Sequence, residues 1–327
     1  MISVAMAVYN GDKYIDEQLD SILNQTKLPD EIVITDDSDN NNTYNVIANY
    51  ISKYKNVKWI YQKNDERLGY CYNFFKAISL TSGDIVFLSD QDDIWELDKI
   101  EKMSDCMFKD NDIKCLCSKY RYIDKDGNVI GKAHEYSTSI SYILNSKTKI
   151  YFKLDVKEFF KILAFPGMCF AITKELVDEL NLLLNKVNRE EIVYHDLVIS
   201  FLAAKDNRFY IYNDVLCNYR MHGDNAIGVD EYNNKDKQDR VEWLDNLANV
   251  QNRVLGYLNC LPNTHKTKIH KEYLNQIIKF NLARIECLSN KKLAALVWKG
   301  LSFNKYLSIK SYLGDISYIL IRGKNVN

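Results

Sequence analysis

The first half of the chain alternates short apolar runs with longer amphipathic stretches. Apolar runs of strand length occur at residues 2–8, 31–35, 57–61 and 85–88, and between them apolar residues recur every three to four positions. Such spacing is typical of strands that alternate with helices. We therefore predict an α/β fold whose central sheet is mostly parallel, is connected by right-handed crossovers and is flanked by helices.

The second half continues this pattern and then changes character. Further strands are expected at residues 115–120 and 208–212, and Asp126-Gly127 has the composition of a hairpin turn. Residues 229–240 are polar without period, which predicts a linker or mobile segment. Amphipathic helical patterns then begin at Val241 and Ile269. We therefore expect one domain at residues 1–228, this linker, and a C-terminal helical region at 241–327.

Composition limits the partners of the protein. With 46% hydrophobic residues, 27% charged residues and a formal net charge of −1, the 327-residue chain has no global basic field for binding nucleic acid. The N-terminal residues lack the basic flank of a signal peptide, and no apolar run reaches the roughly 18 residues of a membrane span. Eight cysteines without a Cys-x-x-Cys spacing are expected to be reduced thiols. We therefore expect a cytoplasmic protein.

The C-terminal tail has a different charge balance. Residues 291–324 contain seven basic residues and one acidic residue, Asp315, interleaved with apolar and aromatic positions. A basic amphipathic segment of this kind suits peripheral contact with the anionic inner face of the plasma membrane. The alternative is a helical hairpin with a solvated basic face.

The most distinctive chemistry follows the apolar run at 85–88. Three carboxylates, Asp90, Asp92 and Asp93, occur within four residues, and a helical pattern is expected directly after Trp95. Ligands of parallel sheets lie beyond the carboxyl ends of the strands, and such an acidic cluster suits Mn²⁺ or Mg²⁺ that holds a diphosphate. The alternative is a solvated acidic turn that caps the next helix. No glycine-rich phosphate loop is present, which disfavours dinucleotide-binding and P-loop folds.

Three motifs in order carry a resemblance to a known family. Residues 7–11 (Ala-Val-Tyr-Asn-Gly), 34–38 (Ile-Thr-Asp-Asp-Ser) and 89–95 (Ser-Asp-Gln-Asp-Asp-Ile-Trp) resemble the inverting family 2 glycosyltransferases, which have the GT-A fold. The resemblance covers residues 1–228, and the third motif is most similar to that of the rhamnosyltransferase-like subgroup. It implies a metal-dependent enzyme that uses a nucleotide-diphosphate sugar.

The resemblance also implies roles for particular residues. The expected nucleotide and donor contacts are Ala7, Val8, Tyr9, Asn10, Asp36, Asp37, Arg67, Asn73, Asp90, Gln91, Arg220 and His222. The expected metal ligands are Asp92, Asp90 and His222, with Asp93 and His195 as supporting residues. Many relatives have a basic residue where this chain has Tyr72, and Arg67 or Lys63 could supply that charge.

The pair His195-Asp196 opens an apolar helical stretch. From the residues alone, an aspartate at a helix start is either a cap or a functional group. In the family this position carries the general base, so the resemblance implies that Asp196 deprotonates an acceptor hydroxyl during a single inverting displacement. Residues 132–152 are expected to form a loop along the acceptor site.

The donor and the acceptor are less constrained. Rhamnose from dTDP-rhamnose is favoured by the resemblance, with a UDP-hexose or UDP-N-acetylhexosamine as alternatives. The expected acceptor is a surface polysaccharide or lipid-linked glycan, as in capsule or lipopolysaccharide synthesis. A nucleotidyltransferase would normally show a glycine-rich N-terminal loop, and a dehydrogenase would need a dinucleotide loop. A binding module that has lost catalysis remains a further alternative.

Overall fold

The computed structural model describes residues 1–137, 139–223, 240–290, 292, 295–296 and 314–320. The chain divides into two compact units. The first consists of Met1–Tyr136, Asn145–Asp155 and Ala164–Gly223, and the second of Ser137–Leu144, Val156–Leu163 and the described part of Asp224–Asn327. The expected linker at 229–240 lies outside the described residues, except for its last residue, Arg240, which begins a helix.

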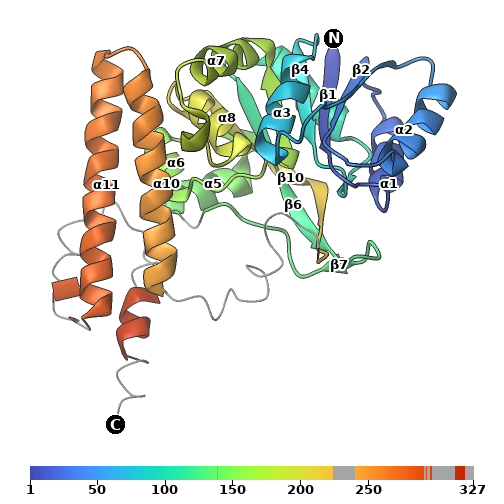
Figure 1. Ribbon diagram of the computed structural model, residues 1–327. Helices are drawn as coiled ribbons and strands as arrows, with labels where there is room; N and C mark the ends of the chain where they lie inside the picture. Colours follow the sequence, from blue (N-terminus) through green and yellow to red (C-terminus); the bar gives the residue numbers. More distant parts are fainter. Residues whose placement is uncertain (138, 224–239, 291, 293–294, 297–313, 321–327) are drawn as a thin grey trace. The chain divides into compact units, whose positions relative to one another are not determined.

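One sheet forms the centre of the first unit (Figure 1). In the order in which they pair, its main strands are β3 (Lys58–Lys63), β2 (Glu31–Asp36), β1 (Ile2–Val8), β4 (Ile85–Ser89), β9 (Phe170–Thr173), β6 (Cys115–Ile123), β10 (Phe209–Arg220) and β5 (Ile94–Trp95). Two short strands, β7 (Val129–Ile130) and β8 (Tyr151–Lys153), pair with β6 and β10. Strands β3, β2, β1 and β4 run parallel, as do β6 and β10. The predicted α/β fold is confirmed.

Helices cover this sheet. They are α1 (Ile15–Leu23), α2 (Asn42–Lys53), α3 (Tyr70–Ser79), α4 (Lys99–Lys109), α7 (Lys174–Leu184) and α8 (His195–Ala204), with short 3₁₀ turns at Gly167–Cys169 and Arg189–Glu191. Helix α3 packs on β1 and β2, and α4 packs on β4 and β10. Strands β2 and β4 are buried along their whole length, as expected for parallel strands with covered faces.

Two local expectations were wrong. Ile94 and Trp95 do not lead directly into a helix: they pair antiparallel with β10 as β5, and α4 begins only at Lys99. Residues 132–152 are not simply a loop, because they contain α5 (Ile140–Thr148) and part of β8. A further feature, for which we made no prediction from the sequence, is that strand β9 lies antiparallel between β4 and β6. Pairing between segments far apart in the chain decided these points, and local periodicity does not report it.

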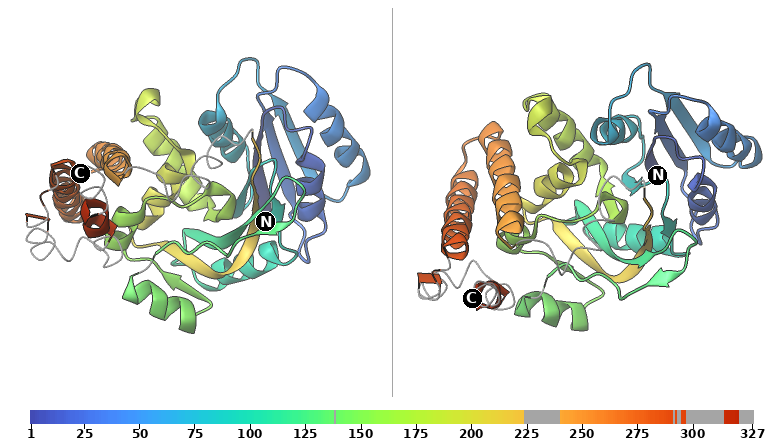
Figure 2. Two further views of the ribbon diagram at one scale, coloured as in Figure 1. Left: turned by 90° about the horizontal axis from the view of Figure 1, so that it is seen from below. Right: turned by 60° about the horizontal axis from the view of Figure 1, so that its bottom comes forward.

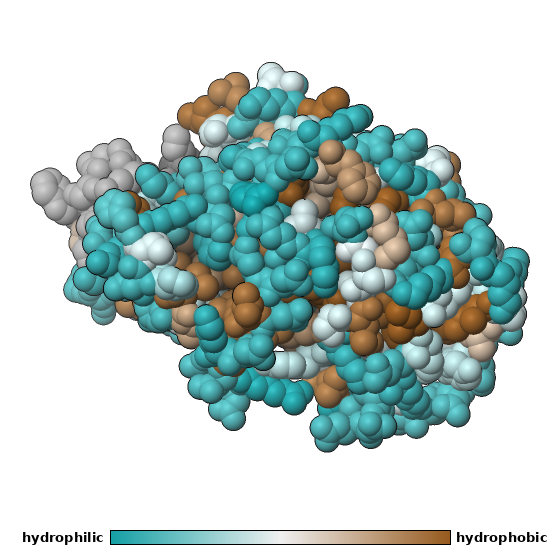
Figure 3. Space-filling model, turned by 90° about the horizontal axis from the view of Figure 1, so that it is seen from above, coloured by the Kyte–Doolittle hydropathy of each residue, from teal (hydrophilic) through white to brown (hydrophobic). Residues whose placement is uncertain are grey.

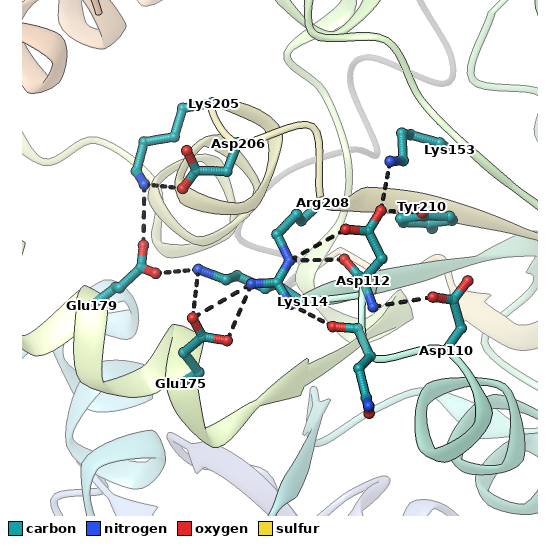
Figure 4. Close-up of polar contacts among 11 residues, drawn as sticks. Asp110, Asp112, Lys114, Lys153, Glu175, Glu179, Lys205, Asp206, Arg208 and Tyr210 are labelled. Atoms are coloured by element: carbon teal, nitrogen blue, oxygen red, sulfur yellow. Dashed lines mark hydrogen bonds and ion pairs between the residues drawn. The ribbon is translucent and has the colours of Figure 1, made fainter. Parts of the chain in front are cut away.

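A charged network ties the amino-terminal end of β6 and β10 to α7 and α8 (Figure 4). Lys114 contacts both Glu175 (3.0 Å) and Glu179. Arg208 pairs with Glu175 at 3.2 Å, and Lys153 with Asp112 at 2.5 Å. These pairs lie at the end of β10 that is remote from Arg220, so we assign them a structural role.

The second unit is helical. Its described helices include α6 (Val156–Ile162), α10 (Arg240–Cys260) and α11 (His265–Ser289), and α10 and α11 lie side by side (Figures 1 and 2). The predicted C-terminal helices are therefore confirmed. No described helix has both the length and the apolarity needed to cross a membrane.

Part of the basic tail is described. Asp315, the acidic residue of the tail, is fully buried and accepts hydrogen bonds from Arg240 (2.8 Å) and from two nitrogens of Arg284 (2.7 and 3.1 Å). Leu296 and Ile319 are buried in one apolar cluster with residues of α10 and α11. The rest of the segment for which membrane contact is predicted lies outside the described residues.

The thiols and the surface agree with the composition. None of the eight cysteines, all of which lie in the described residues, forms a disulfide bond, and six of them are buried. On the face shown in Figure 3, hydrophilic residues predominate and hydrophobic ones are interspersed among them.

Candidate active site

The acidic cluster after β4 lies beside Asp196, at the start of α8. Burial, followed by the nearby carboxylates of Asp92 and Asp196, raises the pKa of the Asp90 carboxyl to about 8, while Lys99 acts in the opposite direction. The fold thus brings together groups that are far apart in the chain. Their mutual repulsion is the electrostatic condition that a bound cation relieves.

Two of the expected metal ligands touch each other. Nε2 of His222, just beyond β10, lies 2.9 Å from Oδ2 of Asp92. The His222 ring also packs against the ring of Tyr14, with 4.9 Å between the centroids. An imidazole nitrogen and a carboxylate oxygen that meet at this distance could both face one ion after a small side-chain adjustment.

Asp93 lies behind this pair. It is fully buried, its Oδ1 accepts a hydrogen bond from the Arg220 backbone amide (3.1 Å), and its Oδ2 lies 3.9 Å from the thiol of Cys217. Burial, followed by the nearby Cys217, Asp90 and Asp92, raises the pKa of Asp93 well above its usual range. Asp93 therefore joins the acidic cluster to β10 from the interior.

The Arg220 side chain is fully buried and joins three segments. Its Nε donates to the Asp92 carbonyl (2.8 Å), one terminal nitrogen donates to the Lys125 carbonyl (3.1 Å), and the other contacts the Glu17 carboxylate (2.6 Å). The guanidinium also lies 4.7 Å from the Tyr14 ring centroid. The sequence suggested a donor contact, whereas these contacts favour a role in holding the backbone of the acidic cluster.

Gln91 connects the acidic cluster to the end of β1 through hydrogen bonds. Its side-chain amide accepts from the Tyr9 amide (2.8 Å) and donates to the Tyr9 carbonyl (3.1 Å). A Cβ on Gly11 would lie 2.3 Å from the Gln91 oxygen, so any larger residue at position 11 would displace the Gln91 amide from this position. Asn10 has a left-handed backbone, with φ of 48°, and its amide donates to Ser38.

The remaining predicted residues at the end of β1 and β2 are tied together. Asp36 is fully buried and accepts from the Tyr61 hydroxyl (2.7 Å), while Asp37 accepts from the backbone amide of Gly69 (2.8 Å). The Asn73 amide donates to the carbonyls of Val8 (3.1 Å) and Thr35 (3.2 Å). These contacts shape the edge at which nucleotide binding is predicted. Val8 itself is buried, and Ala7 is half-buried.

Two arginines lie over aromatic rings near this edge. The Arg67 guanidinium is 3.9 Å from the ring centroid of Tyr9, and that of Arg189 is 4.3 Å from the ring centroid of Tyr72. Arg189 also donates to the Leu68 carbonyl (2.7 Å). The positive charge expected near Tyr72 is therefore present, but it comes from a residue that sequence reasoning missed. Lys63 instead contacts Asn40 and Asn41.

Asp196 opens α8 and is half-buried. Burial raises the pKa of its carboxyl to about 6, although hydrogen bonds from the backbone amides of Leu197 and Gly167 act in the opposite direction. A carboxylate of this kind is a stronger base than an exposed one and is still mostly ionised at pH 7. His195 next to it is buried, stacks on Phe74 with 4.1 Å between centroids, and has no hydrogen-bond partner for either ring nitrogen among the described residues.

Two supporting residues gave no local signal. Lys99 is fully buried, donates to the Met168 carbonyl (2.6 Å) and lies 4.0 Å from the Trp95 ring centroid. In the sequence, a lysine at the start of a helix resembles a solvent-facing residue. Glu17 on α1 likewise resembles a solvent-facing residue in the sequence. Only the structure shows that its carboxylate contacts the buried Arg220 side chain.

The described residues contain no cluster of three or more His, Cys, Asp and Glu side chains already placed to hold a metal ion. Ions of the magnesium type are often held by one or two protein carboxylates, with substrate phosphates and water as the other ligands. The Asp92–His222 pair, with Asp90 beside it, fits such a site, and the mixed oxygen and nitrogen donors suit Mn²⁺.

Comparison with known proteins gives a consistent pattern. The family model described as "Glycosyl transferase family 2" matches residues 3–180. The dTDP-rhamnosyl transferase RfbG of Shigella flexneri is 30% identical over 232 residues, which cover 68% of this chain and 74% of that protein.

Solved structures share the fold at low sequence identity. The S. aureus protein TarS (residues 1–349), in complex with UDP-GlcNAc, has a TM-score of 0.57 at 16% identity, with 90% of this chain and 78% of that chain covered. The mannosyltransferase PcManGT of Pyrobaculum calidifontis, in complex with GDP-Man and Mn²⁺, has a TM-score of 0.57 at 15% identity, with 98% and 84% covered.

Proposed function

The chain belongs to the family 2 glycosyltransferases, and from this premise we propose that it transfers rhamnose from dTDP-rhamnose to a hydroxyl of a surface polysaccharide or lipid-linked glycan. The observation that carries this proposal is that Asp90 lies near both Asp92, which contacts His222, and Asp196. The choice of rhamnose rests on the similarity to the Shigella protein and is an analogy.

In the proposed reaction, the acceptor oxygen forms a bond to the anomeric carbon while the bond from that carbon to the diphosphate breaks. Asp196 takes the acceptor proton, and the electron pair of the broken bond leaves with the diphosphate. Attack from the face opposite the diphosphate inverts the anomeric configuration. Asp92 and His222, with Asp90, would hold Mn²⁺ or Mg²⁺, which neutralises the diphosphate charge when bound.

Other residues position these groups. Arg220 holds the Asp92 backbone, and Gln91 joins the acidic cluster to the end of β1. We infer that the edge formed by β1, β2 and the Arg67–Tyr9 pair binds the nucleotide, because it lies at the carboxyl ends of parallel strands.

Donor hydrolysis across a nucleotide-sugar panel tests this proposal. The panel contains dTDP-rhamnose, UDP-glucose, UDP-galactose, UDP-N-acetylglucosamine and GDP-mannose, each with and without Mn²⁺. We expect metal-dependent hydrolysis that is fastest with dTDP-rhamnose, and its loss in Asp92→Asn but not in Asp178→Asn, an exposed surface control. Preference for a UDP-sugar would replace the donor assignment. Absence of hydrolysis with every donor would contradict the enzymatic proposal and favour a binding module.

A further inference from the structure

Four aromatic side chains gather where β6 and β10 end, and we call them the aromatic face: Tyr120, Tyr122, His134 and Tyr219. Tyr122 and Tyr219 are register partners on the parallel strands, with 5.9 Å between ring centroids. Tyr120 lies 5.3 Å from Tyr122 and 6.1 Å from Tyr219, and His134 stacks on Tyr120 at 4.8 Å. Three of the four residues are half-buried, and Tyr120 is almost fully buried.

A β-bulge turns this face toward the acidic cluster. The register between β6 and β10 shifts between Tyr212 and Cys217, and bulges of this kind re-aim side chains. After the shift, Cys217 lies next to Asp93 and the Arg220 amide donates to the same carboxylate. In the chain, Tyr219 lies between Cys217 and Arg220, the two residues that contact Asp93. Burial, followed by Asp93, Asp90 and Asp92, raises the pKa of Tyr219, in agreement with this proximity.

The aromatic face is also near the proposed base. Strand β6 pairs with β9 up to Cys117 and Phe170, and the 3₁₀ turn at Gly167–Cys169 directly precedes β9. A Cβ on Gly167 would lie 3.5 Å from the Cβ of Asp196. The carboxyl half of β6, which carries Tyr120 and Tyr122, therefore extends past this turn on the edge where Asp196 lies.

The strand order separates two sides of the candidate active site. The predicted nucleotide contacts lie on β1, β2 and the loops that follow them, on one side of β4. The three tyrosines of the aromatic face lie on β6 and β10, on the other side of β4, with β9 between. A displacement reaction needs its two substrates on opposite sides of the anomeric carbon, so the second side is where an acceptor would approach.

Phenol rings have the chemistry to bind a sugar ring. A pyranose has apolar C–H faces and polar hydroxyl edges, and tyrosine presents a rigid apolar ring with a polar tip. The hydroxyls of Tyr120 and Tyr122 lie 3.2 Å apart and can bond both to each other and to a ligand. We propose that the aromatic face binds a saccharide ring of the acceptor. This inference rests on the proposed function and adds the residues that bind the acceptor.

Saturation-transfer NMR on the full chain tests the inference. The probes are methyl glycosides of rhamnose, glucose, galactose and N-acetylglucosamine, each with dTDP-rhamnose titrated in the same sample as a measure of the nucleotide-sugar site. We expect saturation transfer to at least one glycoside, and about tenfold weaker binding in Tyr122→Ala, the loss expected from one aromatic contact. Tyr151→Ala is the matched control, because Tyr151 is a half-buried tyrosine on β8, which pairs with the opposite end of β10.

The outcomes separate the two proposals. Absence of transfer to every glycoside in the wild-type protein, or unchanged binding in Tyr122→Ala, would overturn the inference even if donor hydrolysis is intact. Absence of hydrolysis with every donor contradicts the proposed function instead, whatever the glycosides do. If Tyr122→Ala does not fold, Tyr122→Leu retains apolar bulk without a flat face and is expected to lose the same binding, whereas Tyr122→Phe is expected to retain most of it.

Discussion

Replacing Asp196 with asparagine should abolish sugar transfer and at the same time stabilise the protein at alkaline pH. Asparagine is nearly the same size as aspartate, and its oxygen can still accept the backbone hydrogen bonds that Leu197 and Gly167 donate. It cannot take a proton from an acceptor hydroxyl. A general base contributes about 10²- to 10⁴-fold to a rate, so we expect a loss of about a thousandfold in kcat with donor binding retained.

The stability effect follows from linkage. The Asp196 pKa is raised from 3.8 to about 6 in the folded protein, so the folded state binds the proton more tightly than the unfolded state does. This stabilising contribution is complete below pH 4 and is lost as the pH rises through about 6. One pKa unit corresponds to about 1.4 kcal/mol, so the rise in the Asp196 pKa corresponds to about 3 kcal/mol of folding free energy. We reduce this contribution to about 2 kcal/mol because the Asp196 side chain is half-buried.

Asp196→Asn removes the pH-dependent loss of stability. Relative to the wild type, it should therefore be more stable by about 2 kcal/mol at pH 8, with a Tm higher by roughly 4 to 8 °C, and should show little difference near pH 4. Thermal unfolding at several pH values measures this difference, and transfer assays measure kcat. The wild-type transfer rate should fall below about pH 6.

Two results would refute the reasoning. Transfer by Asp196→Asn above a tenth of the wild-type rate would exclude Asp196 as the base. A difference in stability that is the same at pH 4 and pH 8 would exclude the electrostatic cause. Asp178→Asn on α7, whose carboxylate is exposed and pairs with Lys174 one turn away, controls for the loss of a surface charge and should change neither quantity much.

Three further predictions concern the acidic cluster and its supports. Asp92→Ala should abolish Mn²⁺-dependent donor binding in calorimetry while metal-independent nucleotide binding persists; unchanged Mn²⁺ dependence would remove Asp92 as a ligand. Gly11→Ala should lower the free energy of unfolding in urea by about 1 to 3 kcal/mol and raise the donor KM, because the new Cβ would lie 2.3 Å from the Gln91 oxygen. An unfolding free energy and a KM equal to those of the wild type would show that Gln91 moves without consequence. Arg220→Met should destabilise by about 3 kcal/mol and weaken Mn²⁺ affinity, because buried carbonyls and the Glu17 carboxylate lose their partner; unchanged affinity in the folded variant would limit Arg220 to stability.

Much of the fold was predictable from local patterns. The apolar runs at residues 2–8 and 85–88 became β1 and β4 because each is long enough to cross a sheet that is buried on both faces. The helix at His195-Asp196 also begins as expected. Strand β5, by contrast, is two residues long and exists only because β10 pairs with it, which no local pattern announces.

For the candidate active site, the sequence by itself determined which residue types follow each strand, and therefore that Asp90, Asp92 and Asp93 stand at a strand end. Only the tertiary structure decided which of those groups meet. It paired Asp92 with His222, turned the Arg220 side chain inward to Glu17, and supplied Arg189 where a basic residue beside Tyr72 was expected. The physical reason is range: strand and helix formation depend on neighbours a few residues apart, whereas these contacts join segments that approach only after the sheet has assembled.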